Sequence, residues 1–97
     1  MPAMKLQLLE NGSADSSGLH MVPVEGRYMW SIEGTFNGGS YKLQASNANG
    51  SFVDVAGATM SAAGSMMLWF EQGTLVKLVE SGTTSAMYST LTGPIHG

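Results

Sequence analysis

The sequence predicts an all-β protein: a small antiparallel β-sandwich, jelly-roll-like, of about seven strands with an extended N-terminal segment. Three observations predict it. Charged residues make up only 11% of the 97 residues and glycines number 13, a composition that suits strands and tight turns better than helical bundles. Turn-forming residues recur at the spacing typical of sandwiches and small barrels. Between them, apolar and polar residues alternate with the period of two that marks a half-buried strand.

Residues 1–26 are predicted to be an N-terminal strand and loop, and residues 27–97 the sandwich domain. We expect a first edge strand over Lys5–Leu9, followed by a polar loop that Asn11-Gly12 opens. The segment has too few apolar residues to form a core of its own, so we expect it to pack against neighbouring subunits as an interface arm. Its predicted interface residues are Leu6, Leu8, Leu19, Met21 and Val22.

The clearest strand is the stretch Tyr28–Phe36, where every second residue is apolar or glycine. This alternation predicts that Trp30 and Ile32 lie in the core. The following Asn37–Gly39 is predicted to form the tip of a hairpin, because its Asn-Gly pair tolerates the positive φ of a type I′ turn. Leu43 is the predicted core residue of the strand after that turn.

The remaining predicted strands are shorter. Asn49-Gly50 is a second hairpin turn, and it precedes a short strand at Phe52–Val55 in which Phe52 is predicted to be core. A hairpin around Glu71–Gly73 is expected to join strands at Ser65–Phe70 and Thr74–Glu80, and Thr84–Leu91 is the last strand. No window combines a helical apolar period with a capping box, so we expect under about 10% helix.

The run Met66–Phe70 is unusual because both of its faces are apolar. Met67 and Trp69 share one face, and Met66, Leu68 and Phe70 share the other. A strand of a sandwich buries only one face against the second sheet, so the other face must meet another chain, a loop or solvent. Met67 and Trp69 are therefore added to the predicted interface residues.

The sequence contains no motif for catalysis, for cofactor binding or for metal binding, so we predict a protein that is not an enzyme. It has no cysteine, and its two histidines, His20 and His96, have no carboxylate at ligand spacing. Glu33 and Asp54 are interpreted as outward-facing strand charges rather than as a pair of glycosidase carboxylates.

Charge and hydropathy exclude two classes of partner. The net charge is −3, and the four basic residues are scattered, which argues against nucleic acid and against an anionic membrane surface. No apolar run is long enough to span a bilayer, and the first residues lack the apolar core of a signal peptide. We therefore expect synthesis in a cytoplasm.

The stretch from Trp30 to Val55 carries a pattern of turn residues and alternating apolar residues, and two later segments fit the same pattern. It reads Trp30-x-Ile32-x-Gly34-Thr35-Phe36-x-Gly38-Gly39-x-Tyr41-x-Leu43-Gln44-x-Ser46, then Asn49-Gly50-x-Phe52-Val53-Asp54-Val55, and later Gly73-Thr74-Leu75-x-Lys77-x-Val79 with Ser81-Gly82-Thr83. This pattern resembles small structural proteins of tailed-bacteriophage virions, especially capsid decoration (cement) proteins. The family commonly has Asp-Gly at the second turn, where this chain has Asn49-Gly50.

The resemblance implies a non-enzymatic protein of the virion, made in the host cytoplasm, that binds the major capsid protein and stabilises the shell. It also implies a homo-oligomer, with a trimer favoured, and it transfers no functional residue. Two alternatives stay open from the sequence: a tail- or fibre-associated virion protein, and a carbohydrate-binding β-sandwich module in which Trp69 and a tyrosine stack on a sugar ring.

Overall fold

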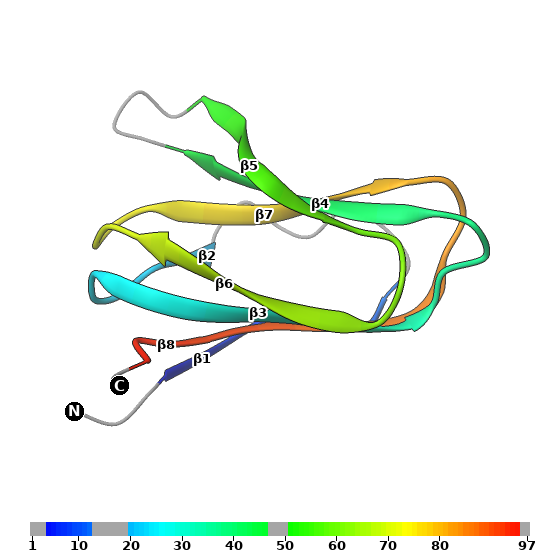
Figure 1. Ribbon diagram of the computed structural model, residues 1–97, viewed down its shortest axis with the longest axis horizontal. Helices are drawn as coiled ribbons and strands as arrows, with labels where there is room; N and C mark the ends of the chain where they lie inside the picture. Colours follow the sequence, from blue (N-terminus) through cyan, green and yellow to red (C-terminus); the bar gives the residue numbers. More distant parts are fainter. Residues whose placement is uncertain (1–3, 13–19, 47–50, 96–97) are drawn as a thin grey trace.

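The computed structural model describes residues 4–12, 20–46 and 51–95, and these residues form eight strands and no helix (Figure 1). The sequence predicted about seven strands; the one it missed has only two residues, too few to show an alternation. The strands are β1 (Met4–Gly12), β2 (His20–Met21), β3 (Gly26–Thr35), β4 (Ser40–Ser46), β5 (Phe52–Met60), β6 (Gly64–Phe70), β7 (Leu75–Ser81) and β8 (Ser85–Gly93).

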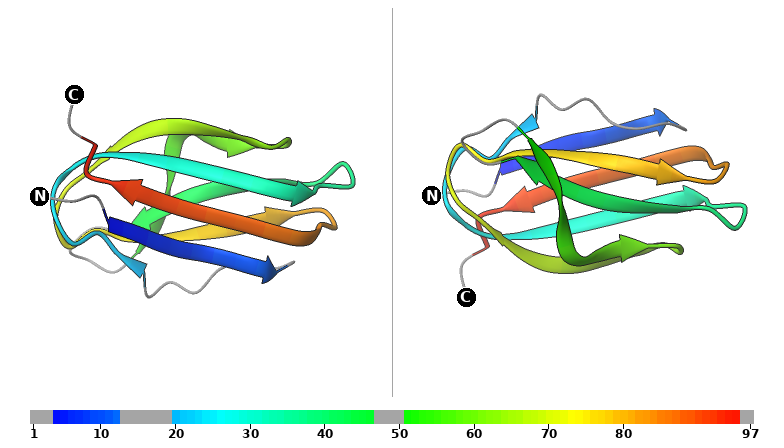
Figure 2. Two further views of the ribbon diagram at one scale, coloured as in Figure 1. Left: turned by 90° about the horizontal axis from the view of Figure 1, so that it is seen from below. Right: turned by 90° about the horizontal axis from the view of Figure 1, so that it is seen from above.

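The eight strands form two four-stranded sheets that pack face to face, with the orders β1-β8-β3-β6 and β2-β7-β4-β5 (Figure 2). Every strand pair is antiparallel. Only β4 and β5 are both consecutive in the chain and adjacent in a sheet, and each other connection passes from one sheet to the other. This is the strand order of a jelly roll. The predicted fold class, an all-β antiparallel sandwich of this type, is confirmed.

The core lies between the sheets and follows the predicted alternation. Trp30, Ile32 and Leu43 are buried, as predicted. Phe52 is a correction, because it is only half-buried and the Lys77 ammonium lies 4.7 Å from the centre of its ring. Phe52 and the exposed Asp54 are two residues apart and so share the outer face of an edge strand, where the second sheet cannot cover them.

Two of the predicted hairpins are wrong. Asn37 and Gly38 have the expected positive φ angles of 50° and 79°, but β3 and β4 on either side of them belong to different sheets. The turn at Glu71–Gly73 likewise joins β6 in one sheet to β7 in the other. The predicted pairing of the strands on either side of Asn49-Gly50 is confirmed as β4 with β5, while the turn itself lies outside the described residues.

The two described strands of the N-terminal segment, β1 and β2, are part of the sandwich. β1 pairs with β8 along its length, and β2 pairs with β7 in the other sheet. A register shift between Gln7 and Leu9 turns both Leu8 and Leu9 inward, where they are 4% and 9% exposed. Val22 is fully buried. In the described part of the segment, these three residues therefore pack into the core of the chain's own sandwich.

Candidate functional site

The two strand carboxylates considered above as a glycosidase pair, Glu33 and Asp54, lie in different parts of the fold. Glu33 lies on β3 and Asp54 on β5, in different sheets, so the structure does not bring them together. The Asp54 carboxylate accepts a hydrogen bond from Gln44 Nε2 at 2.8 Å and pairs with Lys42 Nζ at 3.2 Å, and these partners lower its pKa below the ordinary value of 3.8. Among the described residues, no three His, Cys, Asp or Glu side chains are placed to hold a metal ion.

His20 is half-buried on β2, while His96 lies outside the described residues. In the ranges that the structure covers, no helix has the length and hydropathy to cross a bilayer.

The outer face of the β1-β8-β3-β6 sheet carries the most distinctive set of side chains. Antiparallel register aligns them in rows that run across the strands. Trp69 lies opposite Arg27, Met67 opposite Met29, and Ser65 opposite Ser31. On the other side of β3, Met29 is opposite Thr92, Ser31 opposite Thr90, and Glu33 opposite Tyr88. The face therefore changes from apolar at the Trp69 end, through a row of small hydroxyl side chains, to Glu33 and Tyr88.

Met29, Met67 and Trp69 form an exposed apolar patch at one end of this face. Their exposed fractions are 36%, 45% and 61%. On β6, Met66 and Leu68 alternate with Met67 and Trp69 and pack against the core, as the period of two predicted. Large apolar side chains grouped on the surface of a small domain are the feature that commonly marks a contact with another molecule.

The outer face of the opposite sheet is different in character. Lys42, Gln44 and Lys77 lie on its central strands, and Asp54 on the neighbouring β5 forms the ion pair with Lys42. Charged and amide side chains of this kind keep a sheet face in water. This face also carries the exposed Met21 and the half-buried Phe52, but these two lie on opposite edge strands, whereas Met29, Met67 and Trp69 lie on the neighbouring strands β3 and β6.

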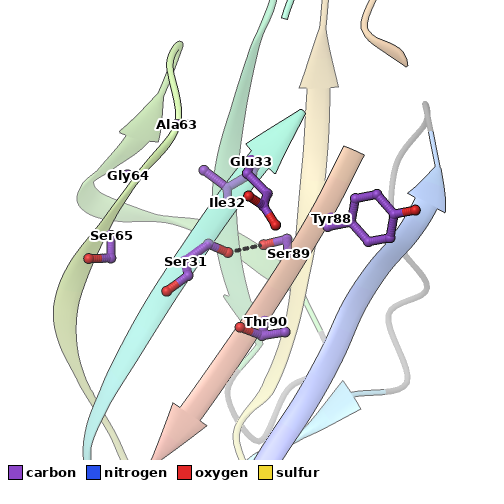
Figure 3. A pocket seen from close by; sticks show the side chains of 9 residues that line it. All are labelled: Ser31, Ile32, Glu33, Ala63, Gly64, Ser65, Tyr88, Ser89 and Thr90. Carbon is purple, nitrogen blue, oxygen red and sulfur yellow. Dashed lines mark hydrogen bonds between the residues drawn. The ribbon is translucent and has the colours of Figure 1, made fainter. Parts of the chain in front are cut away.

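A shallow hollow of about 360 Å³ adjoins the patch on the same face (Figure 3). Its floor is the row of small side chains on β6, β3 and β8. The Ser89 hydroxyl donates to the Ser31 carbonyl at 2.8 Å beneath it, and Tyr88 extends away from Glu33, so its ring does not close over the hollow (Figure 3). The lining residues are Ser31, Ile32, Glu33, Ala63, Gly64, Ser65, Tyr88, Ser89 and Thr90.

The predicted sugar-stacking pair of Trp69 and a tyrosine is not assembled. Tyr28 and Tyr41 are fully buried, which leaves Tyr88 as the exposed tyrosine among the described residues. Trp69 faces Arg27 and Tyr88 faces Glu33, six positions further along β3, which corresponds to roughly 20 Å at 3.3 Å per residue. One sugar ring cannot contact both aromatic side chains.

The predicted interface residues fall into separate groups. Met67 and Trp69 lie in the apolar patch, and Met21 is 54% exposed on the opposite sheet. Leu8 and Val22 are buried in the core and Leu6 packs against it, so these three serve the sandwich itself. Leu19 lies outside the described residues.

Met29 is the residue of the patch that the sequence analysis missed. Its signal was present, because it alternates with the buried Tyr28 and Trp30 and therefore had to face outward.

Comparison with known proteins adds no identification: no family model, no curated protein and no solved structure matches this chain.

Proposed function

We propose that this chain is a structural protein of a tailed-bacteriophage virion, a capsid decoration protein that binds the major capsid protein and stabilises the shell. The observation that carries the proposal is the apolar patch of Met29, Met67 and Trp69 on the outer face of the β1-β8-β3-β6 sheet. The resemblance of the Trp30–Val55 stretch to small virion proteins supplies the identity of the partner. The fold alone does not, since one fold hosts many functions.

The composition of the face suits a protein contact. Tryptophan, methionine and arginine are enriched in the buried centres of protein interfaces, while lysine and glutamate are depleted there. Trp69, Met67 and Met29 supply such a centre, and Arg27 lies directly opposite Trp69. Ser31, Ser65 and Thr92 border the patch on the same face and provide a polar rim. The sheet holds the main chain of these residues in place, so only their side chains would need to be ordered on binding.

The hollow favours a second candidate, the binding of a saccharide. The Glu33 carboxylate could accept hydrogen bonds from sugar hydroxyls, and the hydroxyl groups of Ser31, Ser65 and Thr90 could both donate and accept them. The hollow lies at the low end of the volumes of ligand pockets, and its aromatic neighbour Tyr88 is turned away from Glu33. This candidate thus has polar groups but no stacking surface.

Capsid binding is tested with shells assembled from the major capsid protein that the same genome encodes. The purified chain is mixed with shells over a range of concentrations and sedimented, and the bound fraction is measured. We expect saturable binding to assembled shells, together with a higher melting temperature of the decorated shells. Absence of sedimentation with shells, with binding to an oligosaccharide array that Glu33→Gln removes, would favour the second candidate and contradict the first.

A further inference from the structure

The free edge of β6 differs from every other sheet edge in the described part of the chain. β6 ends its sheet and pairs only with β3. Its seven residues, Gly64–Phe70, contain no charged residue and no proline, and its register with β3 has no shift. Natural proteins usually protect such edges with charges, prolines, bulges or short strands, because an open edge can pair with another strand.

The three other edges carry that protection. β1 has Lys5 and Glu10 and two register shifts in its pairing with β8. β2 is only two residues long. β5 contains Asp54. Its register with β4 shifts between Lys42 and Gln44, which are the partners of Thr59 and Asp54. The exception at β6 is therefore specific to one edge of one sheet.

Hydrogen bonds on β3 show which main-chain groups of β6 face the free edge. The Arg27 carbonyl accepts from Ile95 N–H at 2.6 Å and the Ser31 carbonyl accepts from the Ser89 hydroxyl at 2.8 Å, both from the β8 side. Successive residues of an antiparallel strand direct their main-chain groups to opposite edges. Tyr28 and Trp30 thus direct theirs toward β6.

The register between β3 and β6 shows which residues of β6 direct their main-chain groups toward β3. Leu68 and Met66 are opposite Tyr28 and Trp30, so their main-chain groups point toward β3. The N–H and C=O groups of Ser65, Met67 and Trp69 therefore point outward, away from β3. The side chains of the same three residues lie on the outer face of the sheet.

We propose that β6 pairs in an antiparallel manner with β6 of a second copy of this chain, about a two-fold axis at Met67. In that register Met67 pairs with its own copy and Ser65 pairs with Trp69 of the second copy. A two-fold contact places Met67 beside its own equivalent and the two copies of the same strand along each other, so a charge near the axis would meet like charge, whereas β6 has none. The pairing joins two four-stranded sheets into one continuous sheet of both copies.

Self-pairing leaves the outer face open and enlarges it. A two-fold axis perpendicular to the sheet keeps both outer faces on the same side, so the two apolar patches become one surface across the axis. This inference goes beyond the proposed virion role and does not depend on it. Pairing of this kind gives a dimer, whereas the resemblance to decoration proteins implies a trimer, and the mass in solution separates the two.

The test removes one outward N–H without altering the apolar patch. Ser65→Pro deletes an edge donor at a position where proline is tolerated because the N–H does not bond to β3. Ser65→Ala is the matched control, since it keeps the N–H and loses only the hydroxyl. Light scattering after size-exclusion chromatography measures mass against concentration, and circular dichroism checks the fold. We expect a dimeric parent, a dimer dissociation constant raised at least about tenfold in Ser65→Pro, and a dimer like the parent in Ser65→Ala.

Met67→Lys provides a second variant in case Ser65→Pro fails to fold. It keeps the main chain intact and places two ammonium groups together at the two-fold axis, so it should be monomeric and folded. A parent that is monomeric at millimolar concentration, a trimeric parent, or a Met67→Lys chain that dimerises like the parent would overturn the proposal. Capsid sedimentation of the same samples keeps this result separate from the virion role, because a monomer can still bind shells.

Discussion

Substitution of Ser89 by alanine removes a single oxygen atom, but it should destabilise the sandwich far more than so small a change suggests. Ser89 is 1% exposed, and its hydroxyl accepts the Trp30 Nε1–H at 2.9 Å while donating to the Ser31 carbonyl at 2.8 Å. Trp30 is fully buried, so Ser89→Ala leaves its indole N–H without a partner in the core. A buried donor left unsatisfied costs about 1–3 kcal/mol.

That loss is large for a chain of this length. A domain of 97 residues has a free energy of unfolding of roughly 5–15 kcal/mol, so the variant would lose a substantial share of it. At this size each kcal/mol lowers the melting temperature by about 4–8 °C. Urea unfolding followed by tryptophan fluorescence measures the change.

Trp30→Phe provides the control for this prediction, because it removes the N–H along with the ring that carries it. If the Trp30–Ser89 hydrogen bond is the cause, Ser89→Ala should cost markedly less in a Trp30→Phe background than in the parent. A Ser89→Ala chain within about 0.5 kcal/mol of the parent, the range of an ordinary surface substitution, would refute the reasoning.

Two further predictions concern the first strand and a surface carboxylate. Deleting residues 1–12 removes β1 with its buried Leu8 and Leu9, so the chain should lose its cooperative melting transition; a truncated chain that melts like the parent would show that β1 is dispensable. The lowered pKa of Asp54, caused first by Gln44 and then by Lys42, predicts a stabilising contribution present above pH 3.8 and lost as the pH falls through the lower folded pKa. The stability difference between the parent and Asp54→Asn should shrink below pH 3.8, and a difference that is constant from pH 7 to pH 2 would contradict this.

The sequence predicted which side of a strand faces the core better than which sheet a strand joins. Side-chain direction depends only on the two-residue period of the main chain, which is why Trp30 and Ile32 are buried and Met67 and Trp69 exposed as expected. Phe52 is the exception: it lies on the outer face of β5 with the exposed Asp54, and the predicted strand Phe52–Val55 is too short to show by alternation which of its faces is buried.

The misassigned hairpins have a related cause. Asn37-Gly38 adopts the positive φ angles that its composition predicts, but the same local turn can join strands within one sheet or across two. The outcome is decided by a distant part of the chain. A Cβ on Gly39 would lie 2.7 Å from the Ser81 carbonyl oxygen, and one on Gly82 would lie 2.9 Å from Gly39 Cα. The two connections between sheets pack together there, a contact that no local pattern shows.

The apolar patch on the outer face of the β1-β8-β3-β6 sheet was predictable only in part, because strand register cannot be inferred from a local pattern. Met67 and Trp69 stood out because an apolar run cannot bury both faces, whereas Met29 joins them only through the register of β3 with β6. Leu8 and Val22 were predicted to lie at an interface because a loop-rich segment with few apolar residues cannot form a core of its own. In the structure the strand pairs β1–β8 and β2–β7 place both residues in the core.

The affinity of Trp69→Ala for capsid shells, compared with that of Tyr88→Ala, tests the central proposal most directly. Both aromatic side chains are exposed on the same sheet face, at 61% and 41%, but only Trp69 belongs to the apolar patch. Both variants should melt within a few degrees of the parent, since exposed substitutions change stability little. If the patch docks on the shell, Trp69→Ala should weaken binding by about 30-fold or more, as loss of an interface hot spot of 2 kcal/mol does, while Tyr88→Ala binds like the parent. A folded Trp69→Ala chain that binds shells as tightly as the parent would contradict the proposal.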